Sequence, residues 1–215
     1  MDRTVREKLI AFFSQYKQLQ YKKGEILIRA DDDPPGIFYL REGIVRQYYI
    51  AKNGEEITLN MFKPYSFFPM SWTVSDIHNN YFFEAMTNAF VSKAPKHAVL
   101  EFVKNQPDVL LDLLRRMYIG IEGLWMHIEY LSAGNALSKL SAALLILVRR
   151  FGKQEGGATV VKLKLSEKEL GEYAGMYRET VSREFAILRE NGLIQYEKGV
   201  MIIPNIKRLE DTLSL

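Results

Sequence analysis

The chain has 215 residues, of which 47% are hydrophobic and 26% charged, so we expect a globular protein of two small domains with buried cores. Cysteine is absent, which excludes disulfides, thiolate metal sites, Cys-ligated iron–sulfur clusters and a cysteine nucleophile. The net charge of +3 lies entirely in residues 135–215, which hold 13 Lys and Arg against 10 Asp and Glu. This excess favours contact of that part with a polyanion.

We expect a cytoplasmic protein that makes no membrane contact. Residues 1–10 are half charged and contain no apolar segment of the kind found in signal peptides. The longest strongly apolar run, Leu140–Val148, is shorter than the roughly 20 residues that a membrane span needs.

The first hundred residues change from a helical to a strand-like pattern. Residues 5–20 carry apolar side chains at helical spacing and predict an N-terminal helix. Residues 21–96 are rich in short β-prone runs separated by turn signals, and Asn53-Gly54 is the strongest hairpin signal. The predicted strands are Glu25–Ile28, Gly36–Leu40, Ile44–Ile50, Ile57–Phe62, Tyr81–Ala85 and Phe90–Ser92. This pattern predicts a compact antiparallel barrel or sandwich.

Beyond Pro107, apolar residues recur at alternating intervals of four and three, which is the heptad pattern of a two-stranded coiled coil. The residues are Leu110, Leu114, Met117, Ile121, Leu124, Ile128 and Leu131. We interpret this narrow stripe as the seam of a dimer, because it is longer than one small barrel needs to cover it. The alternative is a long helix packed on its own domain.

A break at Gly134 separates this helix from the last third of the chain, and we place a domain boundary there. Asn135 is a candidate N-cap for a second apolar helix, Ala136–Phe151. A glycine-rich stretch and a predicted strand over Thr159–Leu165 follow.

Residues 165–194 predict two short helices joined by a turn. Ser166 and Glu169 form the S-x-x-E pattern of a capping box at the start of the first helix. Gly175 permits the turn because glycine adopts positive φ without strain. The second helix is predicted over Arg178–Glu190, and the pair forms a helix-turn-helix. The inner face of the second helix is predicted to hold Val181, Phe185 and Leu188.

The residues that follow, Leu193–Ile203, alternate around Lys198-Gly199 and end at Pro204. This pattern predicts a β-hairpin that forms a wing beside the two helices.

The start of the second helix carries side chains suited to DNA. Arg178, Glu179, Ser182 and Arg183 share the face opposite the apolar one. The arginine fork matches guanine O6 and N7, and Glu can accept from cytosine N4. Thr180 could bind a phosphate. The alternative is a solvated helix face with an ion pair between Glu179 and Arg183, worth about 0.2–0.5 kcal/mol.

Several motifs resemble those of the cyclic-AMP receptor protein/FNR (Crp/Fnr) family, which are homodimeric bacterial transcription regulators. In the predicted helix-turn-helix the matching motifs are L-S-E-K-E-L-G (165–171), R-E-T-V-S-R (178–183) and L-R-E-N-G-L-I (188–194). In the strand-rich part K-K-G-E (22–25), L-R-E-G-I-V-R (40–46) and N-G-E-E-I-T-L (53–59) resemble the glycine-turned strands of the family's β-roll.

The resemblance implies an α+β fold in three parts. They are a cyclic-nucleotide-binding-like β-roll (jelly roll) in residues 1–106, a dimerisation helix in residues 107–134 and a winged helix-turn-helix DNA-binding domain in residues 135–215. It also implies double-stranded DNA, a second copy of the chain and RNA polymerase as partners.

The resemblance further implies roles for single residues. Arg178, Glu179 and Arg183 would contact bases and Thr180 a phosphate, and Arg at position 178 favours a TGTGA-like half-site over TTGAT. Tyr177 departs from the family, many of whose members have a capping Ser there. The complete DNA-binding set is Arg178, Glu179, Thr180, Ser182, Arg183, Ser166 and Lys168.

The effector is not indicated by the residues present. Family members that bind cyclic nucleotides carry a G-E pair and an R-S or R-T pair, but Pro69-Met70 and Asn80-Tyr81 stand there in this chain. No cation then faces the phosphate, so we do not expect cyclic AMP. The absence of cysteine excludes an FNR-type iron–sulfur sensor, and no cofactor is evident. An apolar effector pocket is one interpretation of the aromatic stretch, and a core is the other; the pocket residues would be Phe67, Phe68, Met70, Trp72 and Tyr81.

The leading interpretation is a homodimeric, sequence-specific DNA-binding regulator that recognises a near-palindrome. Two alternatives stay open: a ligand-binding module that acts through a protein partner, and a haem-based sensor, although no second ligand accompanies His78, His97 or His127 at a metal-binding spacing. We do not expect an enzyme, because nucleotide-binding and metalloprotease motifs are absent. Activation and repression are equally compatible with the sequence.

Overall fold

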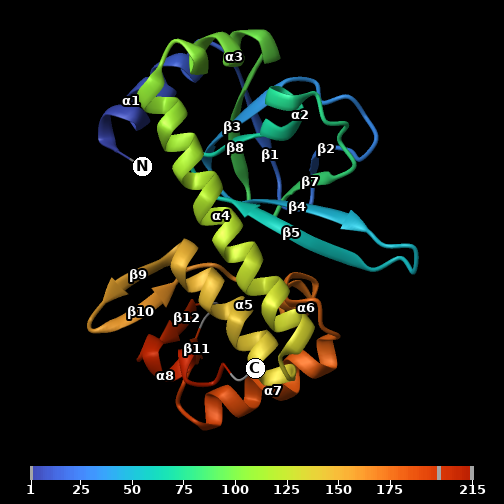
Figure 1. Cartoon of the computed structure of the whole chain (residues 1–215), viewed down its shortest axis with the longest axis vertical. Coiled ribbons are helices and arrows are strands. Elements are labelled where there is room, and N and C mark those ends of the chain that lie inside the picture. Colours follow the sequence, from blue (N-terminus) through green and yellow to red (C-terminus); the bar gives the residue numbers. More distant parts are fainter. Residues whose placement is uncertain (1, 198–199, 214–215) are drawn as a thin grey trace. The chain divides into compact units, whose positions relative to one another are not determined.

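The computed structural model describes residues 2–197 and 200–213, so the predicted wing tip, Lys198-Gly199, lies outside the described residues. The chain divides into two compact units, Met1–Met117 and Tyr118–Leu215, and the division falls within helix α4 (Pro107–Ala133). Figure 1 shows the strand-rich unit in blue to green and the helix-rich unit in yellow to red.

The first unit contains two four-stranded antiparallel sheets, with strand orders β1-β8-β3-β6 and β2-β7-β4-β5. Its elements before α4 are α1 (Arg3–Ser14), β1 (Lys17–Tyr21), β2 (Ile26–Ile28), β3 (Ile37–Glu42), β4 (Val45–Ile50), β5 (Glu56–Phe62), β6 (Phe67–Phe68), α2 (Met70–Ser75), β7 (Phe82–Ala85), β8 (Ala89–Ala94) and α3 (Lys96–Lys104). All six strands predicted from the sequence are present. The predicted hairpin is confirmed as well, since Gly54 has a φ of 84° between the paired strands β4 and β5.

Alternation along the strands of this unit builds two hydrophobic cores. Phe38 of β3 and Phe68 of β6 belong to the inter-sheet core, whose buried members come from both sheets. Tyr39 and Phe67, one residue away on the same strands, belong instead to the helix-side core, which includes side chains of α1, α3 and the start of α4. Successive strand residues face opposite sides, so one sheet separates the two cores.

The predicted N-terminal helix over residues 5–20 is too long. Helix α1 ends at Ser14, and Lys17–Tyr21 form strand β1, which pairs antiparallel with β8. The helical spacing of apolar residues continues to Tyr16. Strand β8, which is more than 60 residues away in sequence, nevertheless forms backbone hydrogen bonds with β1, and these outweigh the local helical pattern.

Helix α2 of this unit was not predicted from the sequence, and α3 was predicted only as a return of helical periodicity after Pro95. Helix α2 occupies the middle of the aromatic stretch, and α3 follows Pro95, where the N-cap side chain makes no hydrogen bond. Neither helix has a polar side-chain cap at its start, which is why no start signal marks them.

The second unit is built around helix α5, nearly all of whose middle residues are buried. Asn135 is the N-cap, as predicted, and its Oδ1 accepts from the Ser138 backbone N–H at 2.9 Å. The elements after α4 are α5 (Ala136–Phe151), β9 (Gly152–Glu155), β10 (Ala158–Val161), α6 (Glu167–Ala174), α7 (Arg178–Glu190), β11 (Gln195–Glu197), β12 (Val200–Ile203) and α8 (Ile206–Glu210). The strands form one antiparallel sheet in the order β11-β12-β10-β9.

The glycine-rich stretch of this unit is a hairpin rather than a loop. Gly156 and Gly157 have positive φ and join β9 to β10, a pairing that the sequence did not predict. The predicted strand over Thr159–Leu165 is shorter, since β10 ends at Val161. The overall class agrees with the prediction: an α+β chain with a β-rich N-terminal part, a long helix and a C-terminal helix-turn-helix.

Candidate nucleic-acid interface

Helix α6 begins with the predicted capping box. The Ser166 Oγ accepts from the Glu169 backbone N–H at 3.2 Å, and the Glu169 carboxylate accepts from the Ser166 backbone N–H at 2.7 Å. Two backbone donors at the helix start are therefore satisfied reciprocally, which fixes the direction in which the chain enters the helix.

The turn between α6 and α7 depends on two glycines. Gly175 has a φ of 64° and ends α6, as predicted. At Gly171 the Met176 backbone N–H donates to the carbonyl at 3.0 Å, and a Cβ added there would lie 2.5 Å from the Met176 oxygen. The close approach of these two backbones sets the geometry of the helix-turn-helix.

Helix α7 separates an apolar face from a charged one, as the sequence predicts. Its buried face contains Val181, Phe185 and Leu188. Arg178, Glu179 and Arg183 are exposed, and Thr180 and Ser182 are half-buried. The base-contacting candidates therefore stand together in the first two turns of the helix, where a recognition helix meets base edges. Of the two remaining candidates, Ser166 caps α6 and Lys168 lies on its exposed side.

The arginines of the charged face contact carboxylates that the sequence did not indicate as their partners. The Arg178 Nε lies 3.6 Å from the Glu167 Oε2, and the Arg183 Nε donates to the Glu184 Oε1 at 3.0 Å. Arg183 thus pairs with its neighbour in sequence rather than with Glu179, the partner in the predicted alternative. The signal that could have indicated these partners is the high acidic content of the two helices.

The start of α7 lacks a side-chain cap. Tyr177 occupies the N-cap position with extended backbone and makes no capping hydrogen bond. This confirms the departure noted in the sequence, so the first backbone N–H groups of α7 receive no hydrogen bond from the N-cap side chain.

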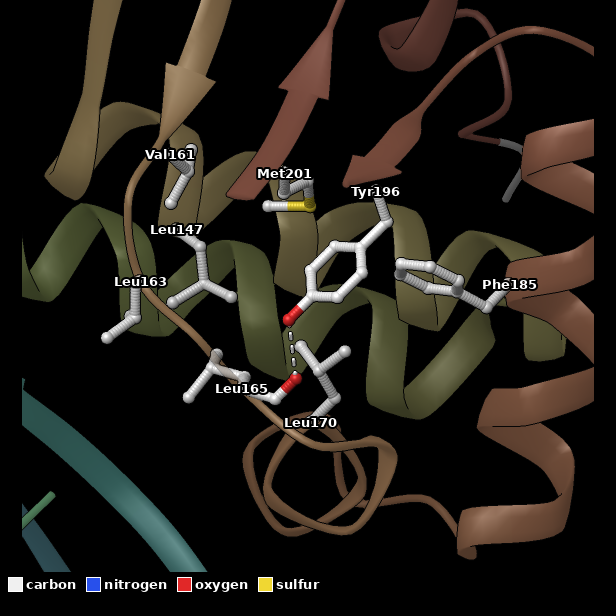
Figure 2. Close-up of a pocket in the computed structure, with 8 residues that line it drawn as sticks. All are labelled: Leu147, Val161, Leu163, Leu165, Leu170, Phe185, Tyr196 and Met201. Atoms are coloured by element: carbon white, nitrogen blue, oxygen red, sulfur yellow. Dashed lines mark hydrogen bonds between the residues drawn. The ribbon is translucent and has the colours of Figure 1, made fainter. Parts of the chain in front are cut away.

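The wing strands are held to the entry of α6. The Tyr196 hydroxyl on β11 donates to the Leu165 carbonyl at 3.1 Å, next to the capping Ser166 (Figure 2). Its ring meets that of Phe185 on α7 edge to face, with centroids 5.9 Å apart. Burial is the largest cause that raises the pKa of Tyr196, so its hydroxyl stays a donor at neutral pH. One side chain thus links the wing to both helices of the motif.

A cavity of about 10 Å³ lies within the second unit. Figure 2 shows the side chains that line it. It is lined by Leu147, Val161, Leu163, Leu165, Leu170, Phe185, Tyr196 and Met201. A cavity of this size has room for about one water at most, and apolar walls leave such spaces dry. It is a packing gap of the core rather than a ligand site.

Helix α4 exposes most of the predicted seam. Of its seven residues, Leu110, Leu114, Met117, Leu124 and Ile128 are exposed, and Ile121 and Leu131 are half-buried. A monomer rarely leaves so many large apolar side chains in water on one helix.

The exposed apolar stripe of α4 is wider than the sequence interpretation allowed. Leu111, Tyr118 and Trp125 follow one another at intervals of seven, immediately beside the seam, and all three are exposed. Ile119 is exposed as well. The stripe therefore has at least two adjacent apolar rows instead of one narrow row.

The five candidate effector-pocket residues divide between the two cores of the first unit. Phe68 and Tyr81 belong to or pack against the inter-sheet core. Phe67, Met70 and Trp72 belong to or pack against the helix-side core. Phe68 and Tyr81 thus lie on one side of the sheet β1-β8-β3-β6, and the other three candidate residues lie on its opposite side.

The three histidines lie in different surroundings. The His127 ring packs against the Tyr173 ring, with the ring centroids 6.0 Å apart, and burial lowers the pKa of His127. The His78 Nε2 lies 3.6 Å from the Asp31 Oδ1, and His97 is on α3. Within residues 2–197 and 200–213, no three His, Asp or Glu side chains gather in a way that could hold a metal ion. In the same residues, no helix is both long and apolar enough to cross a membrane.

Comparison with known proteins agrees with this geometry. Residues 138–212 match the model of the Crp-like helix-turn-helix domain, and residues 18–106 match that of the cyclic nucleotide-binding domain. The global nitrogen regulator of Synechocystis sp. strain PCC 6803 is 28% identical over 187 residues, covering 86% of this chain and 83% of the relative. The chain belongs to the Crp/Fnr family. It is a DNA-binding transcription regulator with a sensor domain, and its relatives are regulators rather than enzymes.

Other members of the Crp/Fnr family show the same correspondence. The transcriptional activator protein Anr of Pseudomonas aeruginosa is 29% identical over 187 residues, covering 86% of this chain and 76% of Anr. A CRP/FNR-family transcriptional regulator from Thermus thermophilus is 25% identical, with a TM-score of 0.69, covering 92% of this chain and 98% of that one. Both the order of the domains and the fold are therefore those of the family.

Proposed function

We propose that this Crp/Fnr regulator recognises DNA through base contacts from the start of helix α7. The observation that carries the proposal is the exposure of Arg178, Glu179 and Arg183 in the first two turns of a helix that follows a capped helix and a glycine turn. Arginine forks pair with guanine and a glutamate accepts from cytosine. Thr180 would contact a phosphate that fixes the register, and Ser182, Ser166 and Lys168 complete the proposed DNA-binding set.

We propose further that two copies of the chain associate through α4. The exposed apolar rows support this, because a second copy would remove them from water. A two-fold dimer places its recognition helices one turn of DNA apart, about 34 Å, and so binds a near-palindrome. We also propose that the chain has three parts, in which the dimerisation helix of residues 107–134 joins the sensor-like domain of residues 1–106 to the DNA-binding domain of residues 135–215.

The proposed half-site is TGTGA-like, because Arg178 stands where cyclic-AMP-type members carry arginine. The proposed effector is not cyclic AMP. Pro69 precedes α2 and Met70 begins it, at the positions where nucleotide-binding members carry the G-E pair. A cyclic phosphate would thus lack its cation and a ribose its carboxylate. RNA polymerase is the proposed partner at the promoter.

The direct test is selection of binding sites from a random duplex pool, with and without cell extract from which macromolecules have been removed. We expect enrichment of a near-palindrome with TGTGA-like half-sites. A dependence on the extract would show that a small molecule is needed. Failure to enrich any sequence under either condition would contradict the proposal and favour a module that acts through a protein partner.

The dimer is tested by sedimentation of Leu124→Lys, which places a charge in the middle of the seam. We expect monomers, since a charged side chain cannot be buried there without a partner. Glu122→Lys is the control, because Glu122 is exposed and outside the heptad seam. An unchanged dimer mass for Leu124→Lys would place the interface elsewhere.

A further inference from the structure

The helix-turn-helix is more acidic than the domain that contains it. Residues 166–190 hold four Lys and Arg against six Glu, although residues 135–215 as a whole are positive. Non-specific affinity for DNA comes from cations that replace the counterions of phosphates. The positive excess therefore lies outside the two helices that are proposed to meet the bases.

Glu167 places one of these carboxylates at the recognition helix. It lies in the first turn of α6, where a negative charge is favoured by the helix dipole. Its Oε1 accepts from the Ser182 hydroxyl at 3.1 Å, and its Oε2 lies 3.6 Å from the Arg178 Nε. Both oxygens of one carboxylate are thus directed to side chains of α7, one turn apart.

The two proposed base-reading arginines are held in the same way. Each contacts a carboxylate through its Nε atom. The partner of Arg178 is Glu167, and the partner of Arg183 is Glu184. In each pair the arginine atom that meets the carboxylate is Nε rather than one of the terminal nitrogens Nη1 and Nη2. Those terminal nitrogens form the fork that pairs with guanine O6 and N7. Contact through Nε therefore restrains the side chain and leaves its base-pairing edge available.

We propose that Glu167 is a specificity-determining residue of the recognition surface. It positions Arg178 and Ser182 before DNA binds, which reduces the side-chain entropy lost on binding. Its negative charge also disfavours contacts with phosphate, which every sequence offers equally. Glu167 thus favours the operator relative to other DNA. This inference rests on the proposed base contacts of α7.

The test is Glu167→Gln, which keeps the size of the side chain and removes its charge. We expect tighter binding to a non-specific duplex, with a slope of log K against log[salt] steeper by about 0.9, the value for one additional phosphate contact. The ratio of operator to non-specific affinity should fall by roughly two- to tenfold, the factor for restraining one long side chain.

Glu190→Gln is the matched control, because Glu190 is exposed at the far end of α7 and its loss changes the net charge equally. We expect the affinity ratio of that variant to equal that of the wild type. In an Arg178→Ala background, Glu167→Gln should lower the ratio by less than it does in the wild-type background, since the positioned Arg178 side chain is gone. Melting temperatures of all variants establish that they are folded.

Two results would overturn the inference. One is an affinity ratio and salt slope in Glu167→Gln equal to those of the wild type. The other is an equal effect of Glu190→Gln, which would reduce the role of Glu167 to net charge. Failure of the underlying function has a different signature: the wild type itself would show no preference for any duplex.

Discussion

Arginine meets carboxylates in both compact units, but the burial of the pairs differs. In the first unit, the Arg46 Nη2 lies 2.5 Å from the Glu56 Oε2 and 2.8 Å from the Glu84 Oε2, and only 9% of the arginine side chain is exposed. In the second unit, the side chains of Arg178 and Arg183 are 68% and 64% exposed.

The difference in burial separates a structural pair from one that can serve recognition. Burial alone would lower the pKa of Arg46, but the carboxylates of Glu84 and Glu56 outweigh burial and raise it. The guanidinium also lies over the Tyr48 ring, 4.1 Å from its centroid. The Arg46 side chain is therefore buried against its partners and is not presented to a ligand in solvent. The Glu167 partner of Arg178 is itself 40% exposed, and an exposed pair costs little to rearrange, so Arg178 can engage DNA.

The largest expected effect follows from breaking the buried cluster. Arg46→Met leaves Glu56 and Glu84 without their cation and should lower the free energy of unfolding by about 3–5 kcal/mol, as measured by urea denaturation. Arg178→Met, which breaks an exposed pair by the same substitution, should change it by less than about 1 kcal/mol. Equal losses in the two variants would refute the distinction by burial.

A smaller effect is expected where the wing joins the helix-turn-helix. Tyr196→Phe removes the hydrogen bond to the Leu165 carbonyl and keeps the ring, so the free energy of unfolding should fall by about 0.5–1.5 kcal/mol. Tyr177→Phe is the control, because the exposed Tyr177 side chain makes no capping hydrogen bond. A loss in Tyr196→Phe no larger than in the control would show that the wing anchor contributes nothing.

The smallest effect concerns pH. Burial lowers the pKa of His127 below its ordinary value of 6.5, so the unfolded chain takes up a proton at a higher pH than the folded one. Stability should therefore be complete above about pH 6.5 and fall as the pH drops below it. We expect the urea midpoint to fall less between about pH 7.5 and 5.5 in His127→Gln than in the wild type. Identical pH profiles would exclude a contribution from His127.

The parts of the structure that the sequence predicted are those determined locally. The capping box of Ser166 and Glu169, the N-cap of Asn135 and the positive φ of Gly175 each depend on residues within a few positions. Strand β1 was not predicted because its partner β8 is distant in sequence. Helix α2 was not predicted because the aromatic side chains around it fit a strand equally well.

The recognition surface likewise combines features determined locally with contacts between distant residues. The spacing of Arg178, Glu179 and Arg183 follows from helix geometry, so their common exposed face could be predicted. The contact of Arg178 with Glu167 joins two helices across a turn, and no periodicity indicates it. The second apolar row of α4, with Tyr118 and Trp125, was overlooked because the heptad pattern considers only the seam.

The central claim is that exposed arginines of α7 identify the operator by its bases. It is tested most directly by comparing the affinity of wild type and Arg183→Ala for the selected operator and for the same operator with one base pair changed in each half-site, at fixed salt. We predict that the wild type discriminates between them by about 1–3 kcal/mol for each changed base pair and that Arg183→Ala, still folded in a thermal melt, loses this discrimination at the position it contacts. Equal discrimination by both proteins at every position would contradict the account.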